Sequence, residues 1–209
     1  MRKKMVLALL MAALLAGGVF AQNFSLSAGG GISFAPTFSE AKHDGKNFDA
    51  YKKSGFDLGI NVFFDATYAE VNIGLLFGSQ KRADDDKIFN TTTLLLGLVG
   101  KYPFSLNNKF VLFPFVGIDY SINLSARLNG AEIEDNDYFK KADEFNALSI
   151  LFGVGADFRL TYALYLRAEA GYGIVLNTRA QDDNVSDDSK LVYFNGKIPI
   201  KLALGYRFR

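Results

Sequence analysis

The chain has 209 residues, no cysteine, no tryptophan, 20 glycines, 20 phenylalanines and a formal net charge of +1. The absence of cysteine excludes disulfides and thiolate metal sites, so packing and hydrogen bonds must hold the fold together. A near-neutral net charge gives no sign of the basic surface that binds nucleic acid.

The N-terminus has the three parts of a secretory signal peptide. Arg2, Lys3 and Lys4 form a basic start, an apolar run covers residues 5–16, and small residues precede a cleavage point after Ala21. The run is shorter than the roughly 17–25 residues that a membrane-spanning helix needs. We therefore expect residues 1–21 to be removed, and residues 22–209 to form one domain. Removal of three positive charges would change the net charge to about −2.

The rest of the chain contains eight segments in which apolar and polar residues alternate. A period of two is typical of a half-buried β-strand, and no segment shows sustained helical spacing. The segments cover residues 24–34, 55–65, 68–77, 91–102, 110–124, 147–159, 164–176 and 194–208.

The connections between these segments also alternate, in length. They are long and polar at about 35–54, 78–90, 125–146 and 177–191, and short near 65–67, 103–109 and 160–163. Long loops at one end and short turns at the other are typical of a barrel that crosses an outer membrane. We predict an all-β fold, an eight-stranded antiparallel up-and-down transmembrane β-barrel.

The apolar face of the strands could point inward, as in a soluble barrel, or outward to lipid. The interior of an eight-stranded barrel is just wide enough for packed side chains or one small ligand. The many Phe, Leu and Ile side chains of the apolar face would not fit there, whereas the glycine-rich polar face would. The size of the lumen therefore favours an apolar face in contact with lipid.

Charge supports the same orientation. The apolar face of the segments carries no charged residue, as expected where a lipid-facing Lys or Arg near the bilayer midplane costs about 2–4 kcal/mol. Buried charges must be paired, so we predict ion pairs in the lumen, among them Asp157 with Arg167 across the hairpin around Thr161. The candidates, six acidic and six basic, are Asp57, Asp65, Glu70, Lys101, Asp119, Asp157, Arg159, Arg167, Glu169, Lys197, Lys201 and Arg207.

Three further features refine this prediction. Pro114 and Pro199 fall inside predicted strands, so we expect bulges there, or a local break near a rim. The aromatic residues expected at the short-turn end are Phe64, Tyr102, Phe158, Tyr206 and Phe208. The lumen is expected to be partly apolar, through Phe63, Leu76, Leu95, Val99, Val111, Phe113, Phe115 and Leu151.

The chain ends in "KLALGYRFR", in which Leu202, Leu204, Tyr206 and Phe208 share the apolar face. This ending resembles the C-terminal assembly signal of outer-membrane barrels, with Arg209 after the terminal aromatic residue. In architecture, the whole mature chain resembles the small eight-stranded outer-membrane proteins of the OmpA membrane domain, OmpX and OmpW kind. The resemblance implies outer-membrane lipid as surroundings. It also implies periplasmic chaperones and the barrel-assembly machinery as partners during biogenesis.

Little in the sequence points to catalysis. His43, in "EAKHDGKNFD", is the only histidine, and a loop rich in Gly and Lys favours a solvated side chain over a catalytic base. The acidic stretches "RADDDK" (82–87), "EIEDND" (132–137) and "DDNVSDD" (182–188) lack the ordered spacing of a calcium loop. We expect no catalytic residue, no metal and no cofactor.

Two functions remain compatible with these observations. The first is a non-enzymatic barrel of the bacterial envelope, with a structural or surface-interaction role through its extracellular loops. The alternative is a passive OmpW-like channel for small hydrophobic molecules, since the predicted lumen is partly apolar.

Overall fold

A computed structural model of the chain describes residues 25–43, 46–82, 88–128, 131–132, 146–177 and 191–208. The predicted signal peptide, most of the three acidic stretches and Arg209 lie outside the described residues. All regular structure within the described ranges is β-strand. In those ranges, no helix has the length and hydropathy that crossing a membrane requires.

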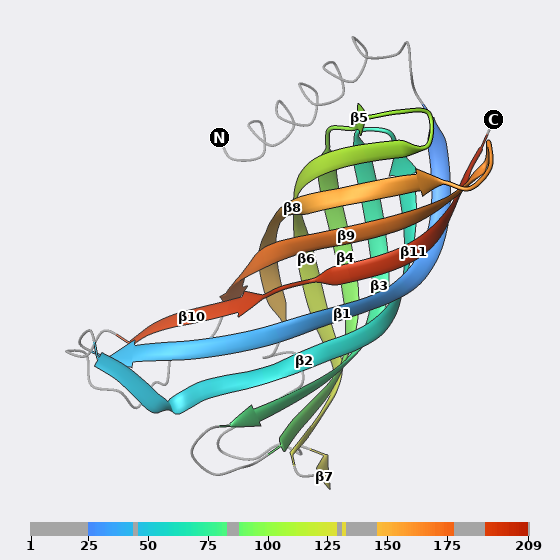
Figure 1. The fold of residues 1–209 in the computed structure, drawn as a ribbon. Helices are drawn as coiled ribbons and strands as arrows, with labels where there is room; N and C mark the ends of the chain where they lie inside the picture. The colour runs from blue at the N-terminus through green and yellow to red at the C-terminus, as the bar shows by residue number, and fades with distance from the viewer. Residues whose placement is uncertain are drawn as a thin grey trace, which may run out of the picture.

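The strands form one antiparallel sheet that closes on itself (Figure 1). Closure occurs because β1 pairs with β2 on one side and with both β10 and β11 on the other. Since β10 and β11 occupy a single position, the barrel has the eight predicted strand positions. The strands are β1 (Leu26–His43), β2 (Lys46–Ala66), β3 (Ala69–Arg82), β4 (Ile88–Lys101), β6 (Phe110–Leu128), β8 (Ala147–Arg159), β9 (Leu164–Asn177), β10 (Leu191–Lys197) and β11 (Ile200–Arg207), with the short β5 (Phe104–Ser105) and β7 (Ala131–Glu132) paired to β6.

The two ends of the barrel differ. At the end that we call the turn end, short connections join β2 to β3, β4 to β6 and β8 to β9, and β1 starts beside the end of β11 (Figure 1). The four other connections meet at the opposite end, which we call the loop end, and span residues 44–45, 83–87, 129–146 and 178–190. The predicted division of the connections between two ends is therefore confirmed, but only the last two loop-end connections are long.

Several strands continue into the predicted loops. The structure extends β1 to His43 and starts β2 at Lys46, and β3 likewise continues to Arg82. The prediction of loops over 35–54 and 78–82 was therefore wrong. Backbone pairing continues where neither strand face is apolar, so no alternation marks it in the sequence.

The two prolines leave the strand register unchanged. Pro114 pairs with Val154 without a shift, and its carbonyl accepts the Tyr102 N–H at 3.2 Å. Its ring nitrogen, which has no hydrogen to donate, therefore faces the interruption between β4 and β5. Pro199 lies in the gap between β10 and β11. The expected break is therefore confirmed at Pro199 only, whereas the prediction was wrong for Pro114, where β6 continues without a break or bulge. The bulges occur elsewhere, at Ser39/Ala41 and Thr92/Thr93.

A two-residue turn joins β2 to β3, and its first residue has unusual geometry. Thr67 adopts a φ of 54°, which is uncommon for a β-branched side chain. Its Oγ1 accepts the Ser25 N–H at 2.8 Å and donates to the Ser25 carbonyl at 3.1 Å. These hydrogen bonds therefore hold Ser25, the residue that precedes β1, against the strained turn.

The strands expose their apolar face to the outside. Ile60, Val154 and Leu202 are 62, 62 and 54% exposed, whereas Phe63, Glu70 and Arg167, which point inward, are 1, 2 and 3% exposed. The outside of this barrel is thus apolar, and its buried interior carries the charges.

Candidate functional site: the barrel lumen

A network of five charged side chains crosses the lumen near the turn end. Its members come from five strands: Asp65 on β2, Glu70 on β3, Lys101 on β4, Asp157 on β8 and Arg167 on β9. All five are buried. We refer to them as the charge network.

Arg167 is the centre of the charge network. Its Nε and Nη2 donate to the two oxygens of Asp157 at 2.7 and 2.8 Å, which is the bidentate geometry of strong Arg–carboxylate pairs. Nη2 also donates to Asp65 Oδ2 at 2.6 Å, and Nη1 donates to Glu70. One guanidinium therefore binds three carboxylates on three different strands.

Lys101 completes the network from the opposite side. Its Nζ lies 2.5 Å from Asp65 Oδ2 and 3.0 Å from Glu70 Oε2. The Asn72 amide donates to the other Glu70 oxygen at 2.8 Å. Two cations thus face three carboxylates, and the hydrogen bonds compensate for the removal of these charges from water.

Aromatic rings surround the cations. The Arg167 guanidinium lies 4.6 Å from the Phe63 ring centroid, 5.0 Å from that of Phe113 and 5.2 Å from that of Tyr165. Lys101 lies 4.7 Å from the Phe113 centroid. These distances are within the cation–π range. The Tyr165 hydroxyl donates to Ser27 Oγ at 2.9 Å, so its polar end is also satisfied.

Two separate ion pairs lie further toward the loop end. Lys201 and Glu169 are register partners on β11 and β9, with Nζ 3.4 Å from Oε2. Lys197 reaches across the lumen to Asp119 on β6 and lies 2.8 Å from both carboxylate oxygens. The structure thus brings nine of the twelve predicted ion-pair residues together.

The other three predicted residues have no ion-pair partner among the described residues. Asp57 lies opposite Gly78 on the lumen side. Arg159 and Arg207 are the last residues of β8 and β11, at the turn end. Arg159 Nη1 donates to the Asn108 carbonyl at 3.2 Å, and the Arg207 guanidinium lies 5.8 Å from the Tyr165 ring centroid. The two arginines contact a backbone carbonyl and an aromatic ring instead of a carboxylate because they end their strands at the mouth of the barrel.

Glycines make room for large side chains in the lumen. Phe113 and Phe115 lie directly opposite Gly155 and Gly153 on β8. A Cβ on either glycine would overlap the facing ring. The same relation holds for Gly29 with Phe63, Gly59 with Leu76, Gly117 with Val99, Gly173 with Leu151 and Gly205 with Tyr165.

These interactions fill the cross-section of the barrel. The eight apolar lumen residues named from the sequence are all buried. Between Asn61, Phe63, Glu70, Arg167 and their neighbours, the described side chains leave no room for a water molecule. At this level, the lumen is a packed core of ion pairs and rings.

The comparison with known families agrees with this architecture. A sequence model described as "Outer membrane protein beta-barrel domain" matches residues 6–208. The chain belongs to this outer-membrane β-barrel family. The protein is therefore located in the bacterial outer membrane, and its apolar outer face contacts lipid. By the usual arrangement of such barrels, the turn end is periplasmic and the loop end is extracellular.

Solved structures of other outer-membrane barrels resemble this chain at low sequence identity. The neisserial surface protein A (NspA) is 12% identical with a TM-score of 0.49, and the match covers 88% of this chain and 97% of NspA. OprG from Pseudomonas aeruginosa is 14% identical with a TM-score of 0.45, covering 89 and 96%. Ail, the attachment invasion locus protein of Yersinia pestis, is 18% identical with a TM-score of 0.35, covering 88 and 99%. No curated protein sequence is significantly similar to this chain.

The outer surface of this outer-membrane barrel carries aromatic residues at the periplasmic end. All five residues predicted there are exposed, between 42 and 58%. Tyr68 and Phe104 extend this aromatic girdle, with ring centroids 6.1 and 4.8 Å from that of Tyr102. Aromatic girdles are typical of the membrane–water interface of such barrels.

The predicted assembly signal lies on the outer face of β11 and just beyond it. Leu202, Leu204, Tyr206 and Phe208 are each about half exposed, at 54, 49, 50 and 50%. The Phe208 N–H donates to the Leu26 carbonyl at 2.8 Å, so the signal is part of the closing seam of the barrel. Recognition of this segment by the assembly machinery stays a prediction.

Two features of this barrel were missed from the sequence. Thr67 gave no signal, because its role depends on its backbone angle and on the neighbouring Ser25. The second feature is the set of lumen positions where a glycine faces a large side chain, which we call glycine–large pairs. They become visible only once the strand register is known. A systematic comparison of opposed positions along each predicted hairpin would have found those between consecutive strands.

Proposed function

We propose that the protein is a sealed, non-enzymatic barrel that anchors its extracellular connections in the outer membrane. In this proposal the lumen conducts neither ions nor small solutes. The barrel serves envelope structure or surface interaction.

The packing around Arg167 is the observation that carries this proposal. A solute that passed through the barrel would have to separate Arg167 from at least one of its three carboxylate partners. Leaving a buried charge unpaired is strongly unfavourable, by about 3–5 kcal/mol. The rings of Phe63, Phe113 and Tyr165 would also have to move, although each is 2% exposed or less.

The apolar part of the lumen supports the same conclusion. Val99, Phe113, Phe115 and Leu151 form one buried cluster. They contact one another and cover facing glycines, so they contribute to packing. The passive channel for small hydrophobic molecules would need this apolar cluster to line an open path.

Recordings in planar lipid bilayers test the sealed lumen. We expect no discrete conductance steps from the folded wild-type protein. The triple variant Phe63→Ala, Phe113→Ala and Tyr165→Ala removes the three rings around Arg167, and we expect it to conduct. Phe64→Ala is the matched control, because Phe64 points outward and its removal leaves the lumen unchanged.

Folding of each variant is checked by its electrophoretic mobility with and without boiling, since folded barrels typically migrate differently from the boiled chain. Discrete steps from the wild-type protein would contradict the proposal and favour the channel. A folded triple variant without conductance would show that these rings do not seal the lumen.

The absence of catalysis has a separate test. The side chain of His43 lies outside the described residues, so its surroundings do not enter the proposal. We expect His43→Ala to leave the lipid A composition of cells overproducing the protein unchanged. A change in acylation that depends on His43 would instead make the barrel an enzyme of the membrane rim.

A further inference from the structure

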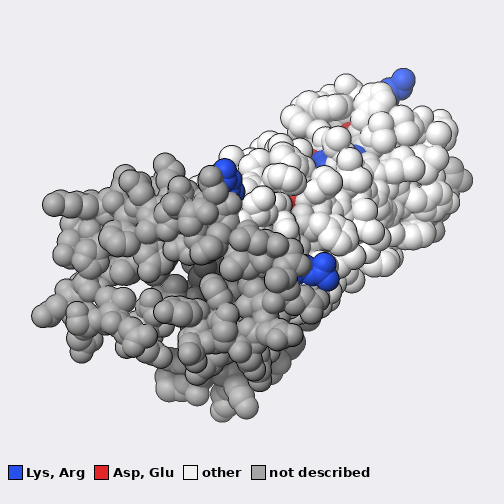
Figure 2. Space-filling model, turned by 90° about the horizontal axis from the view of Figure 1, so that it is seen from below, with Lys and Arg blue, Asp and Glu red and all other residues white. Residues whose placement is uncertain are grey.

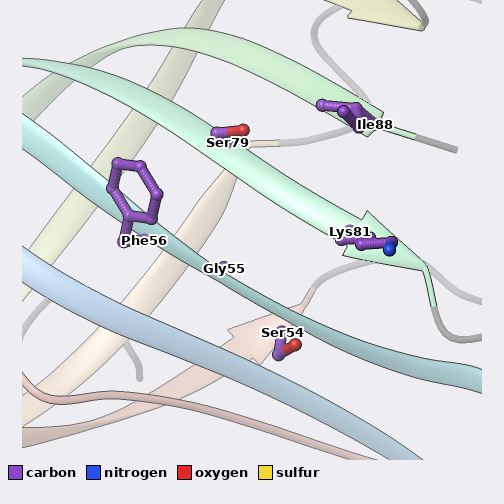
Figure 3. A pocket seen from close by; sticks show the side chains of 6 residues that line it. All are labelled: Ser54, Gly55, Phe56, Ser79, Lys81 and Ile88. Carbon is purple, nitrogen blue, oxygen red and sulfur yellow. The ribbon is translucent and has the colours of Figure 1, made fainter. Parts of the chain in front are cut away.

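The outer wall of the barrel has a hollow near the extracellular end. It has a volume of about 400 Å³, and its lining comes from β2, β3 and β4 (Figure 3). Phe56 and Ile88 provide an apolar part, whereas Ser54, Ser79 and Lys81 provide polar groups. The hollow therefore combines surfaces for hydrocarbon with groups that bind an anion.

The strand register shows that these side chains point outward. Ser54, Lys81 and Ile88 are opposed across β2, β3 and β4. Opposed residues of an antiparallel pair project from the same face. All three are exposed, as is Phe56, which belongs to the apolar outer face at 46% exposure. The hollow thus faces the membrane.

A second basic side chain lies on the same face. Phe56, Ser79, Asn90 and Arg127 form one opposed row across β2, β3, β4 and β6, and Arg127 is exposed. Strands are about 4.8 Å apart, so β3 and β6 are separated by roughly 10 Å. Arg127 therefore lies on the same outer face as Lys81, two strands away and beside the residues that line the hollow. Both cations also interact within the protein, so a bound anion would share those contacts or exchange with them.

The exposed charged side chains of the described residues have one sign. The exposed basic residues among the described side chains are Lys81, Lys109 and Arg127, and no described Asp or Glu is exposed. In Figure 2 the described wall is mostly white, with a few basic side chains standing out and acidic ones visible only as small spots between other atoms. An anion at this wall meets basic groups without facing exposed carboxylates from the described part.

The position of the hollow identifies the kind of anion. It lies where the apolar rows of β2 and β3, which include Leu58 and Phe77, give way to hydroxyl, amide and basic side chains. Basic side chains at such a boundary attract anionic lipid headgroups. Aromatic side chains lie near both boundaries, and Phe38 opposes Ser54 toward the extracellular end. The hollow is distinguished by Lys81 and two serines placed beside Phe56 and Ile88.

We propose that this hollow binds a lipid of the outer leaflet through its phosphoryl headgroup. Lys81 and Arg127 bind phosphoryl oxygens, and the Ser54 and Ser79 hydroxyls donate further hydrogen bonds. An acyl chain lies over Phe56 and Ile88. This proposal is independent of whether the lumen is sealed.

Native mass spectrometry of the refolded, detergent-solubilised protein tests the site, with diphosphoryl lipid A as the probe and EDTA present. We expect a bound complex, and about tenfold weaker binding for Lys81→Gln/Arg127→Gln, since each cation near an anionic lipid surface contributes modestly. Lys109→Gln is the matched control. It removes an exposed cation at the periplasmic end and should leave binding unchanged.

Two comparisons separate the sources of binding. Phosphate-free lipid A should bind like the double variant, because it retains the acyl chains alone. Inorganic phosphate, which lacks an acyl chain, should compete only weakly. Equal binding by the wild type and a folded double variant would overturn the proposal. So would equal losses in the Lys109 variant, or equal binding of phosphate-free lipid.

Discussion

The periplasmic and extracellular halves of this barrel are built differently. In the periplasmic half, Arg167 and Lys101 link five strands through three carboxylates. Toward the extracellular end, Lys197 forms an ion pair with one carboxylate of the described residues, that of Asp119. The outside carries aromatic residues near both boundaries, and the hollow with Lys81 lies at the extracellular one. Among the described residues, the ion pairs that link several strands therefore lie near the turn end, whereas the two long connections, at 129–146 and 178–190, leave from the loop end.

The largest effect is expected from removing the centre of the charge network. Arg167→Met leaves Asp65, Glu70 and Asp157 buried with only Lys101 as a cation. We expect the free energy of unfolding to fall by about 3–5 kcal/mol, as for other broken buried pairs. Urea unfolding of the refolded protein in detergent micelles measures this change.

Lys197→Met is the comparison in the other half. It removes the partner of a single carboxylate, so we expect a smaller loss of about 1–3 kcal/mol. Equal losses from the Arg167 and Lys197 variants would contradict the difference between the two halves.

A smaller effect is expected from adding one methyl group to the lumen wall. In Gly155→Ala the new Cβ would overlap the ring of Phe113, which is 2% exposed and has little space to move. Overpacking of this kind typically costs about 1–3 kcal/mol. The measurement is again the free energy of unfolding in urea.

Gly100→Ala is the control for this substitution, since an added Cβ there would find only the Val116 carbonyl, at 3.7 Å. We expect little change. The double variant Gly155→Ala/Phe113→Leu should recover part of the lost stability, and failure to recover any would mean that the ring is not the obstacle.

The smallest effect is expected at the turn between β2 and β3. Thr67→Val keeps the strained φ of a β-branched residue but loses the hydrogen bonds to Ser25, which costs about 1 kcal/mol. Thr67→Gly loses the same bonds but relieves the strain. The valine variant should therefore be the less stable of the two, and the reverse order would show that the hydrogen bonds contribute little.

The sequence predicted the fold best where one strand face is apolar and the other polar. The segment 147–159 coincides with β8, and 164–176 differs from β9 by one residue. The same signal failed over 39–53, where neither face is consistently apolar, although β1 and β2 still pair 39 with 53 and 41–43 with 46–48. Apolar and polar residues alternate only where one strand face contacts an apolar environment. The alternation therefore ends before the backbone pairing does.

The lumen could be predicted only in part. The Asp157–Arg167 contact could be predicted by counting residues back from the short turn, because the two residues are opposed across it. The contacts of Arg167 with Asp65 and Glu70 join strands that are not neighbours in the sheet. Their proximity depends on the closure and tilt of the whole barrel, which no local pattern in the sequence encodes.

The glycine–large pairs of the lumen also constrain how this protein can evolve. They lie across six of the eight strand interfaces, and each pair has a nearly fixed combined volume. A lineage that enlarges Gly205 would have to shrink Tyr165, and the reverse also holds. Homologues should therefore exchange volume between opposed positions. The strand register of the barrel would then be recorded in which positions change together.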